Sequence, residues 1–156
     1  MNTSHENSGW LRVEEAQERI LAQTIPVAVD RVILDAALGL ALGQPLDCPF
    51  DLPAFDNSAM DGFAVRYADL EAGRELPVAF EAAAGSDPPP LPRGVAARIF
   101  TGGRMPAGAD TVVMQEDTQA VGSGVRIVSL PDAGQGAHVR RRGTYVAKGQ
   151  RLLEAG

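Results

Sequence analysis

The chain has 156 residues, of which 45% are hydrophobic and 22% are charged, and its formal net charge at pH 7 is −6. This balance is typical of a folded globular protein and excludes a disordered chain. The acidic charge argues against general binding of nucleic acid or anionic membranes, which requires a basic surface. The single cysteine, Cys48, excludes an internal disulfide framework and a cysteine-rich zinc site.

Two helices are predicted near the N-terminus. Apolar residues recur at helical spacing over residues 11–24, and Pro26 is expected to stop this helix. A second helix is predicted over residues 33–42, with Leu38 on its apolar stripe and Gly43 as its C-cap. Both apolar stripes are expected to be buried in the core.

The character of the chain changes after the second helix. Prolines at positions 45, 49 and 53 favour an extended path and forbid a helix. Beyond them, short apolar runs bounded by glycine or proline predict strands over residues 63–65, 77–82, 96–100, 111–115 and 125–130. We therefore predict a compact β unit over residues 50–130, followed by one or two further strands within residues 138–153.

The most unusual polar segment is residues 56–62, with the sequence DNSAMDG. One interpretation is an Asx-turn that contacts no ligand, since Asp, Asn and Ser are common turn formers. The other is a loop that presents a carboxylate to a hard cation such as Mg²⁺ or to a reacting water. Asp61 is the better placed of the two aspartates, because glycine at the next position lets a ligand approach the backbone closely.

Two further segments have both a structural and a functional interpretation. Residues 99–103 are a strand end that opens into a glycine turn, which is either an ordinary turn or an anion-binding concavity to which Thr101 adds a hydroxyl. Residues 140–142 are three arginines, either a solvated strand or a clamp for phosphate or another oxyanion. If they lie in a strand, Arg140 and Arg142 share one face. Glu116 and Asp117 are interpreted as a solvated turn.

These segments, taken in order, resemble the molybdopterin molybdenumtransferase family, of the MoeA and gephyrin E-domain type. The first resembling stretch is DLPAFDNSAMDGFAVR, and the others follow it in the family's order. The matching stretches are residues 51–66, 98–103, 106–117 and 139–143, with the predicted helices at residues 13–24 and 34–42.

The resemblance implies a fold and a reaction. The expected fold class is α+β, with a mainly-β domain (50–130) inserted into an elongated, discontinuous domain of N-terminal helices (1–49) and returning strands (131–156). Enzymes of this family are transferases of molybdenum cofactor biosynthesis that insert molybdate into adenylylated molybdopterin and release AMP with the help of Mg²⁺. The family also implies a homodimer with a molybdopterin adenylyltransferase as its pathway partner. The acidic charge, the polar N-terminus and the lack of an apolar run of membrane-spanning length predict a cytoplasmic protein with neither nucleic acid nor a membrane as partner.

The resemblance also assigns roles to residues of this chain. Asp61 and Thr101 match catalytic positions, and Asp61 is also the expected metal ligand. The expected contacts to the acidic ligand come from Ser58, Gly102, Gly103, Arg140 and Arg142.

The chain departs from the family's pattern in two respects. Thr144 and Tyr145 stand where the family usually carries a Glu-Asp pair. The family's α/β pterin-binding domain and C-terminal β domain have no counterpart in these residues, so we expect the chain to be an inactive fragment by itself. The alternatives are a non-catalytic interaction module like the scaffold part of gephyrin, or a small solute-binding β domain.

Overall fold

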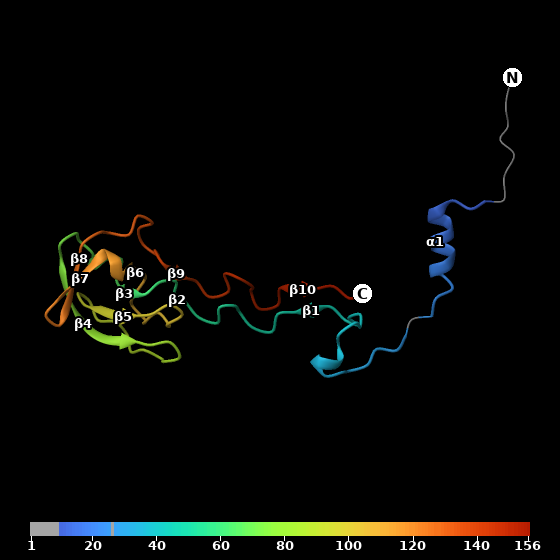
Figure 1. The fold of residues 1–156 in the computed structure, drawn as a ribbon, viewed down its shortest axis with the longest axis horizontal. Helices are drawn as coiled ribbons and strands as arrows, with labels where there is room; N and C mark the ends of the chain where they lie inside the picture. The colour runs from blue at the N-terminus through green and yellow to red at the C-terminus, as the bar shows by residue number, and fades with distance from the viewer. Residues whose placement is uncertain (1–9, 26) are drawn as a thin grey trace, which may run out of the picture. The chain divides into compact units, whose positions relative to one another are not determined.

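A computed structural model describes residues 10–25 and 27–156 (Figure 1). The chain divides into two compact units, residues 1–43 with Gly156 and residues 44–155. Ten short strands, one α-helix and three 3₁₀ turns make up the described elements, so the protein is mostly β. None of the described helices is long and apolar enough to cross a bilayer.

The first unit contains less helix than predicted. Helix α1 (Val13–Leu21) confirms the first predicted helix, with Glu14 and Glu15 in its first turn where carboxylates favour the helix dipole. Pro26 lies outside the described residues. The second predicted helix is wrong, because only the 3₁₀ turn η1 (Leu34–Ala36) forms there. Gly39 has a φ of 85°, a left-handed conformation that ends helical turns.

The predicted burial of both apolar stripes is also wrong. Helix α1 has no buried residue, and the side chains of Ile20 and Leu38 are 66% and 95% exposed. Helical spacing identifies the face that favours burial, but it does not supply a covering element. No described element of the first unit covers these side chains.

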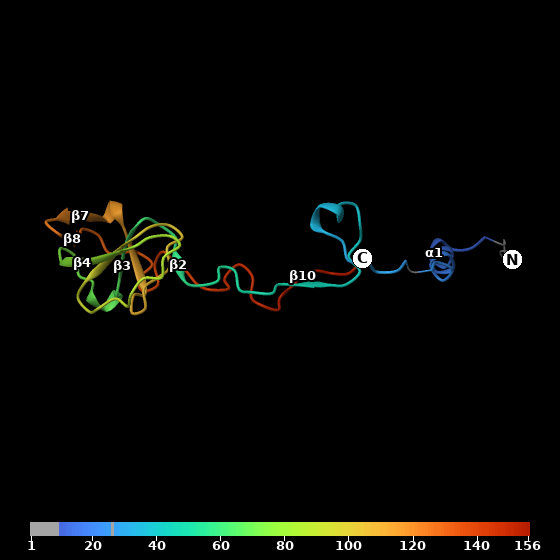
Figure 2. The same ribbon diagram turned by 90° about the horizontal axis from the view of Figure 1, so that it is seen from below.

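The second unit is built on a six-stranded sheet with the order β6-β3-β5-β4-β8-β7, in which only the β4–β5 pair is parallel. Figure 2 shows this unit from a second direction, with β3, β4, β7 and β8 labelled. Five of the six strands confirm the predicted runs. The sixth, β7, was not predicted and forms a hairpin with β8. The strands are β3 (Gly62–Val65), β4 (Glu75–Ala82), β5 (Ala96–Ile99), β6 (Thr111–Met114), β7 (Thr118–Val121) and β8 (Gly124–Ile127).

The core lies on both faces of this sheet. Consecutive residues of a strand point to opposite faces, and Ala64 and Val65 of β3 accordingly pack into two different apolar clusters. Val112 and Val113 of β6 divide between the clusters in the same way. Because both faces are covered, these strands read as continuous apolar runs and not as alternating ones.

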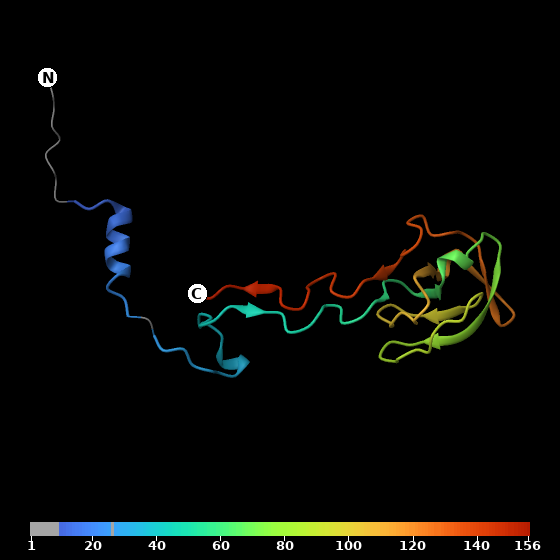
Figure 3. The same cartoon turned by 180° about the vertical axis from the view of Figure 1, so that it is seen from behind.

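Two antiparallel segments, residues 46–58 and 139–153, run beside each other outside the large sheet (Figure 3). We call them the paired segments. They pair through β1 (Leu46–Asp47) with β10 (Arg151–Leu153) and through β2 (Asn57–Ser58) with β9 (Val139–Arg140). The proline-rich entry is thus extended, as predicted. Both pairs belong to the same unit as the large sheet.

Two leucine truncations should separate the core from the exposed stripe. Leu76 of β4 is 1% exposed, so Leu76→Ala should cost about 2–5 kcal/mol of unfolding free energy. Leu38→Ala should change it by no more than about 0.5 kcal/mol, because the side chain is 95% exposed. Denaturant titrations followed by circular dichroism measure both values. Equal losses for the two variants would contradict this assignment of the core.

Candidate functional site

Three polar residues meet at one edge of the large sheet. Asp61 precedes β3, Thr101 follows β5 and Gln115 follows β6. Strand β3 lies between β5 and β6 and is antiparallel to both, with Gly62 opposite Ile99 on one side and Met114 on the other. The start of β3 therefore lies beside the ends of both neighbours. This register brings together residues that are up to 54 positions apart.

Asp61 and Thr101 contact each other directly. The backbone N–H of Thr101 donates to Asp61 Oδ1 at 2.7 Å, and the Thr101 hydroxyl donates to the same oxygen at 2.8 Å. These two hydrogen bonds lower the pKa of Asp61, and the nearby charge of Arg98 acts in the same direction, against a smaller opposing effect of burial. Asp61 is therefore ionised at neutral pH, and its Oδ2 accepts no hydrogen bond from any described residue.

An open pocket of about 300 Å³ lies over this contact. Four side chains besides Asp61 and Thr101 line it, namely Met60, Met114, Gln115 and Glu116. Glu116 belongs to η3 (Gln115–Asp117) and faces the pocket, so the interpretation of this acidic pair as a solvated turn is incomplete. The pocket thus combines two carboxylates, a hydroxyl and an amide between two thioethers.

Gly62 is required at this edge for a reason that the sequence did not reveal. It does not adopt a left-handed backbone. A Cβ atom at this position would instead lie 2.0 Å from the carbonyl oxygen of Val113 in β6. Glycine here allows β3 and β6 to approach closely enough to place Asp61 beside Gln115, whose N–H donates to the Asp61 carbonyl at 3.1 Å.

The predicted anion-binding amides are occupied within the protein. The N–H of Gly102 donates to the Ser58 carbonyl at 2.9 Å, and the N–H of Gly103 donates to the Phe100 carbonyl at 2.8 Å. Ser58 is fully buried, and its hydroxyl donates to the Met60 carbonyl. In this geometry the hydrogen bonds of Ser58, Gly102 and Gly103 join the loops that carry Asp61 and Thr101.

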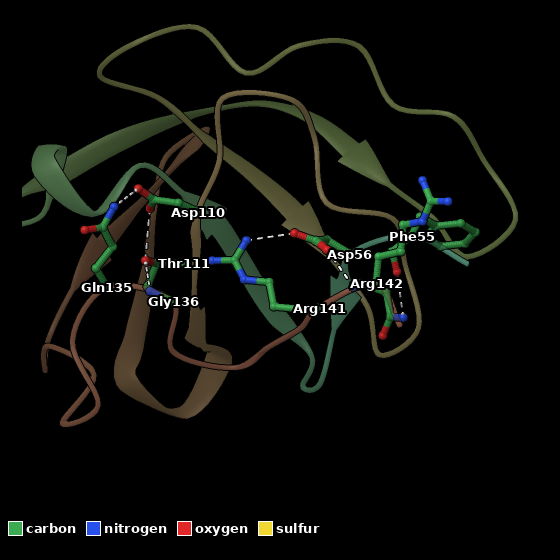
Figure 4. A network of polar contacts seen from close by, with 9 residues as sticks. Phe55, Asp56, Asp110, Thr111, Gln135, Gly136, Arg141 and Arg142 are labelled. Carbon is green, nitrogen blue, oxygen red and sulfur yellow. Dashed lines mark hydrogen bonds and ion pairs between the residues drawn. The ribbon is translucent and has the colours of Figure 1, made fainter. Parts of the chain in front are cut away.

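The three consecutive arginines have separate environments. β9 ends at Arg140, so the shared strand face predicted for Arg140 and Arg142 does not form. Arg141 pairs with Asp56 at 2.7 Å (Figure 4), and Arg142 pairs with Asp51 at 2.6 Å. The side chain of Arg140 makes only a 3.5 Å hydrogen bond to the Ala59 carbonyl, and it forms no ion pair with any residue that the structure describes.

Known proteins resemble this chain over most of its length. Residues 11–156 match the family model described as MoeA N-terminal region (domain I and II). The chain belongs to the MoeA family. The molybdopterin molybdenumtransferase of Nostoc sp. is 45% identical over 134 residues, which are 81% of this chain and 30% of the relative. That of Synechococcus elongatus is 38% identical over 156 residues, 91% of this chain and 39% of the relative.

The structural comparison agrees with the family assignment. A crystal structure of the molybdopterin biosynthesis MoeA protein from Pyrococcus horikosii matches with a TM-score of 0.80 at 30% identity, covering 92% of this chain and 38% of that chain. The MoeA-family chain thus spans between 30% and 39% of the length of these relatives.

Several pocket residues of this MoeA-family chain were not found from its sequence. Met114, Gln115 and Glu116 come next to Asp61 only through the pairing of β3 with β6, whereas Met60 is its neighbour in the sequence and was not recognised as a pocket residue. Arg98 carried a usable signal, since it is a single charge within the apolar run of residues 96–100. Such a residue inside a strand commonly has a specific polar partner.

Substituting Gly62 should test the close strand approach. Gly62→Ala should lower the unfolding free energy by about 3 kcal/mol, because the new methyl group meets backbone atoms that cannot rotate away. Gly102→Ala is the matched control. Its Cβ would meet open space, so it carries only the cost of a left-handed alanine, about 1–2 kcal/mol. Denaturant midpoints measure both, and an equal or smaller loss for Gly62→Ala would refute the steric explanation.

Acidification should loosen the paired segments. The pKa of Asp51 is lowered from its ordinary value of 3.8 by hydrogen bonds from the Lys148 backbone and the Arg142 side chain. Burial alone would raise the pKa of Asp56, but hydrogen bonds from the Arg142 backbone and the Arg141 side chain outweigh it and lower the value. A carboxylate with a lowered folded pKa stabilises the fold above the unfolded value and loses this contribution as the pH falls through the folded value.

The stabilisation by both carboxylates should therefore be complete well above the ordinary value of 3.8 and should decline gradually as the pH falls through that value and the lowered folded values. The amide protons of Arg142 and Lys148 should shift in this range in NMR spectra, because both donate to these carboxylates at 2.7 Å. Asp51→Asn together with Asp56→Asn should abolish the transition. Its persistence in the double variant would assign it to other groups.

Proposed function

We propose that this chain supplies the Asp61–Thr101 part of the active site of a molybdopterin molybdenumtransferase. The whole enzyme would insert molybdate into adenylylated molybdopterin and release AMP. The observation that carries the proposal is the pairing of Asp61 with Thr101, which leaves one ionised carboxylate oxygen free at an open pocket. The transferase names of the relatives do not favour the scaffold alternative.

The two residues have different roles in this proposal. Thr101 saturates Oδ1 of Asp61 with two hydrogen bonds and so fixes the direction of the carboxylate. Oδ2 is then the atom that binds a cation or accepts a proton from water. A carboxylate that is ionised and held in one orientation is suited to either task, because it needs no rearrangement when the reaction begins.

The residues present fit a Mg²⁺ ion that takes only some of its ligands from this chain. Mg²⁺ usually takes one or two protein carboxylates and completes its coordination with water and substrate phosphate oxygens. Asp61 would hold it through Oδ2, and Glu116 lines the same pocket. No described group of three His, Cys, Asp or Glu residues would form a full cage, so the remaining ligands must be supplied from elsewhere. When bound, the ion would neutralise charge on the phosphoryl group that leaves as AMP.

Among the predicted ligand contacts, Arg140 remains the best candidate for an anion-binding side chain. Its guanidinium has no carboxylate partner among the described residues, whereas Arg142 is engaged by Asp51. We assign Ser58, Gly102, Gly103 and Arg142 to the support of the loops around the site. The division into residues 1–49, 50–130 and 131–156 stays part of the proposal.

We also infer that the full-length enzyme is a cytoplasmic homodimer that receives its substrate from a molybdopterin adenylyltransferase. The exposed apolar side chains of the first unit support an assembly, since such surfaces commonly mark interfaces. Sedimentation of the full-length protein measures its state, and a monomer at micromolar concentration would overturn this part of the proposal.

A chimaeric enzyme tests the function. This chain would replace the matching N-terminal part of the Nostoc sp. relative, and AMP release from adenylylated molybdopterin with molybdate and Mg²⁺ would be measured. The chimaera should turn over, and this chain by itself should not. Robust turnover by the chain alone would refute the proposal that it supplies only part of the site.

Asp61→Asn should lower the rate of the chimaera by about 100-fold or more, because the free oxygen loses its charge. Its thermal stability should fall only slightly, since Asn retains an oxygen for Thr101 and loses only the charge that strengthens the two hydrogen bonds. Asp87→Asn is the matched control, removing one carboxylate from an exposed ion pair with Arg104 that does not line the pocket. It should leave the rate within about twofold. A comparable rate for Asp61→Asn and the control would exclude Asp61 from the site.

A further inference from the structure

Arg98 of β5 occupies an unusual environment directly beside the candidate site. Its guanidinium lies over the ring of Phe63, 5.1 Å from the ring centroid, and over the ring of Phe100 at 4.8 Å. Phe63 of β3 stands opposite Arg98 in the strand register. Two aromatic faces stabilise a cation and restrict its orientation, so this guanidinium is held in place without a carboxylate.

Within residues 10–25 and 27–156, Arg98 forms no ion pair. One of its terminal nitrogens donates to the Gly62 carbonyl at 3.3 Å, and the other donates to Gln115 Oε1 at 2.8 Å. The stronger of its two polar contacts is therefore with a side chain that lines the Asp61–Thr101 pocket.

This contact fixes which end of the Gln115 amide faces the pocket. A guanidinium can only donate hydrogen bonds, so the amide must turn its oxygen toward Arg98. The amide nitrogen then points away from Arg98, and Nε2 lies 3.5 Å from Glu116 Oε1 at the pocket wall. The pocket otherwise offers carboxylate acceptors, and Gln115 Nε2 adds a donor to them.

We propose that Arg98 is a positioning residue that orients the Gln115 amide, so that Gln115 Nε2 donates a hydrogen bond to a phosphoryl or molybdate oxygen of the substrate. This inference rests on the proposed function and deepens it, because it assigns a specificity-determining donor to the same pocket.

The orientation can be tested on this chain without any substrate. When the chain is labelled with ¹⁵N, the side-chain amide of Gln115 should show a heteronuclear NOE close to that of the rigid backbone, because Arg98 holds it. Gln23, whose side chain bonds to no described residue, gives the mobile reference. Arg98→Met should lower the Gln115 value to that of Gln23, and Arg98→Lys should restore part of it.

Arg126→Met is the matched control for this experiment. Arg126 also lies on a strand and donates to a glutamine, Gln119 Oε1, at 3.4 Å, but neither residue lines the pocket. This variant should leave the Gln115 amide unchanged. A Gln115 amide that is as mobile as that of Gln23 in the unaltered chain would overturn the positioning role.

The ligand contact is tested in the chimaera with molybdate and adenylylated molybdopterin as probes. Arg98→Met and Gln115→Leu should each raise the KM for one of these substrates by about 10-fold, with a smaller change in kcat. The double variant should be no worse than Gln115→Leu, because Arg98 acts through Gln115. Multiplied effects in the double variant would overturn the proposed coupling.

Different results would refute the proposed function and the proposed role of Gln115. An inactive chimaera with an intact fold would remove the proposed function and the substrate contact, while the NMR measurement would still decide the orientation of Gln115. If Asp61→Asn lowers the rate of the chimaera as expected but Arg98→Met leaves the KM values unchanged, the proposed function stands and the role of Gln115 as a donor is refuted.

Discussion

The candidate site depends on the close approach of β3 to β6 at Gly62. A side chain at this position would collide with the Val113 carbonyl, so the two strands can pair in this register only if residue 62 lacks a Cβ atom. The same register places the end of β5 beside the start of β3 on the other side. The glycine therefore allows Asp61 to lie beside Gln115, and the β3–β5 pairing brings Thr101 to the same edge, although the loops that carry these residues are distant in sequence.

Aspartates hold the loops that surround this sheet. Asp61, Asp51 and Asp56 each accept a backbone N–H from a distant segment, at 2.7 Å in every case. Asp110 does the same for Tyr67, and it also accepts from Gln135 and Thr111, as Figure 4 shows. One carboxylate thus joins three segments. Burial would raise the pKa of Asp110, but these hydrogen bonds outweigh burial and lower it. In a chain rich in glycine and proline with strands of two to eight residues, these carboxylates satisfy loop N–H groups that backbone carbonyls do not reach.

The sequence was informative where structure is local. Apolar runs between glycines and prolines predicted five strands of the sheet, and the Asp61 and Thr101 loops were recognised as unusual. It was uninformative where partners are distant. The reason for glycine at position 62 is an atom of residue 113, and the pocket role of Gln115 follows from strand pairing. β7 was missed because its residues are polar or small and half-exposed, so no apolar run marks them.

The predicted burial of the apolar stripes in residues 11–24 and 33–42 was wrong for a related reason. Periodicity is a property of one segment, whereas burial is a property of two surfaces. Leu38 lies on a periodic apolar stripe, but no surface in the described part of the chain covers it. The same distinction applies to the arginines at positions 140–142, which are identical in sequence terms but differ in their partners.

The two oxygens of the Asp61 carboxylate have different roles, and this difference connects the structure of the site with its proposed chemistry. Asp61 Oδ1 anchors the Thr101 loop, and this bonding is what keeps Oδ2 directed to the pocket. The charge of Arg98 favours the ionised form of Asp61 without pairing with it, since its guanidinium is held by two phenyl rings and by Gln115. A direct ion pair would have neutralised the carboxylate and blocked its free oxygen. Because the Arg98 guanidinium is bound to Gln115 and not to Asp61, Asp61 keeps both its charge and its access to a ligand.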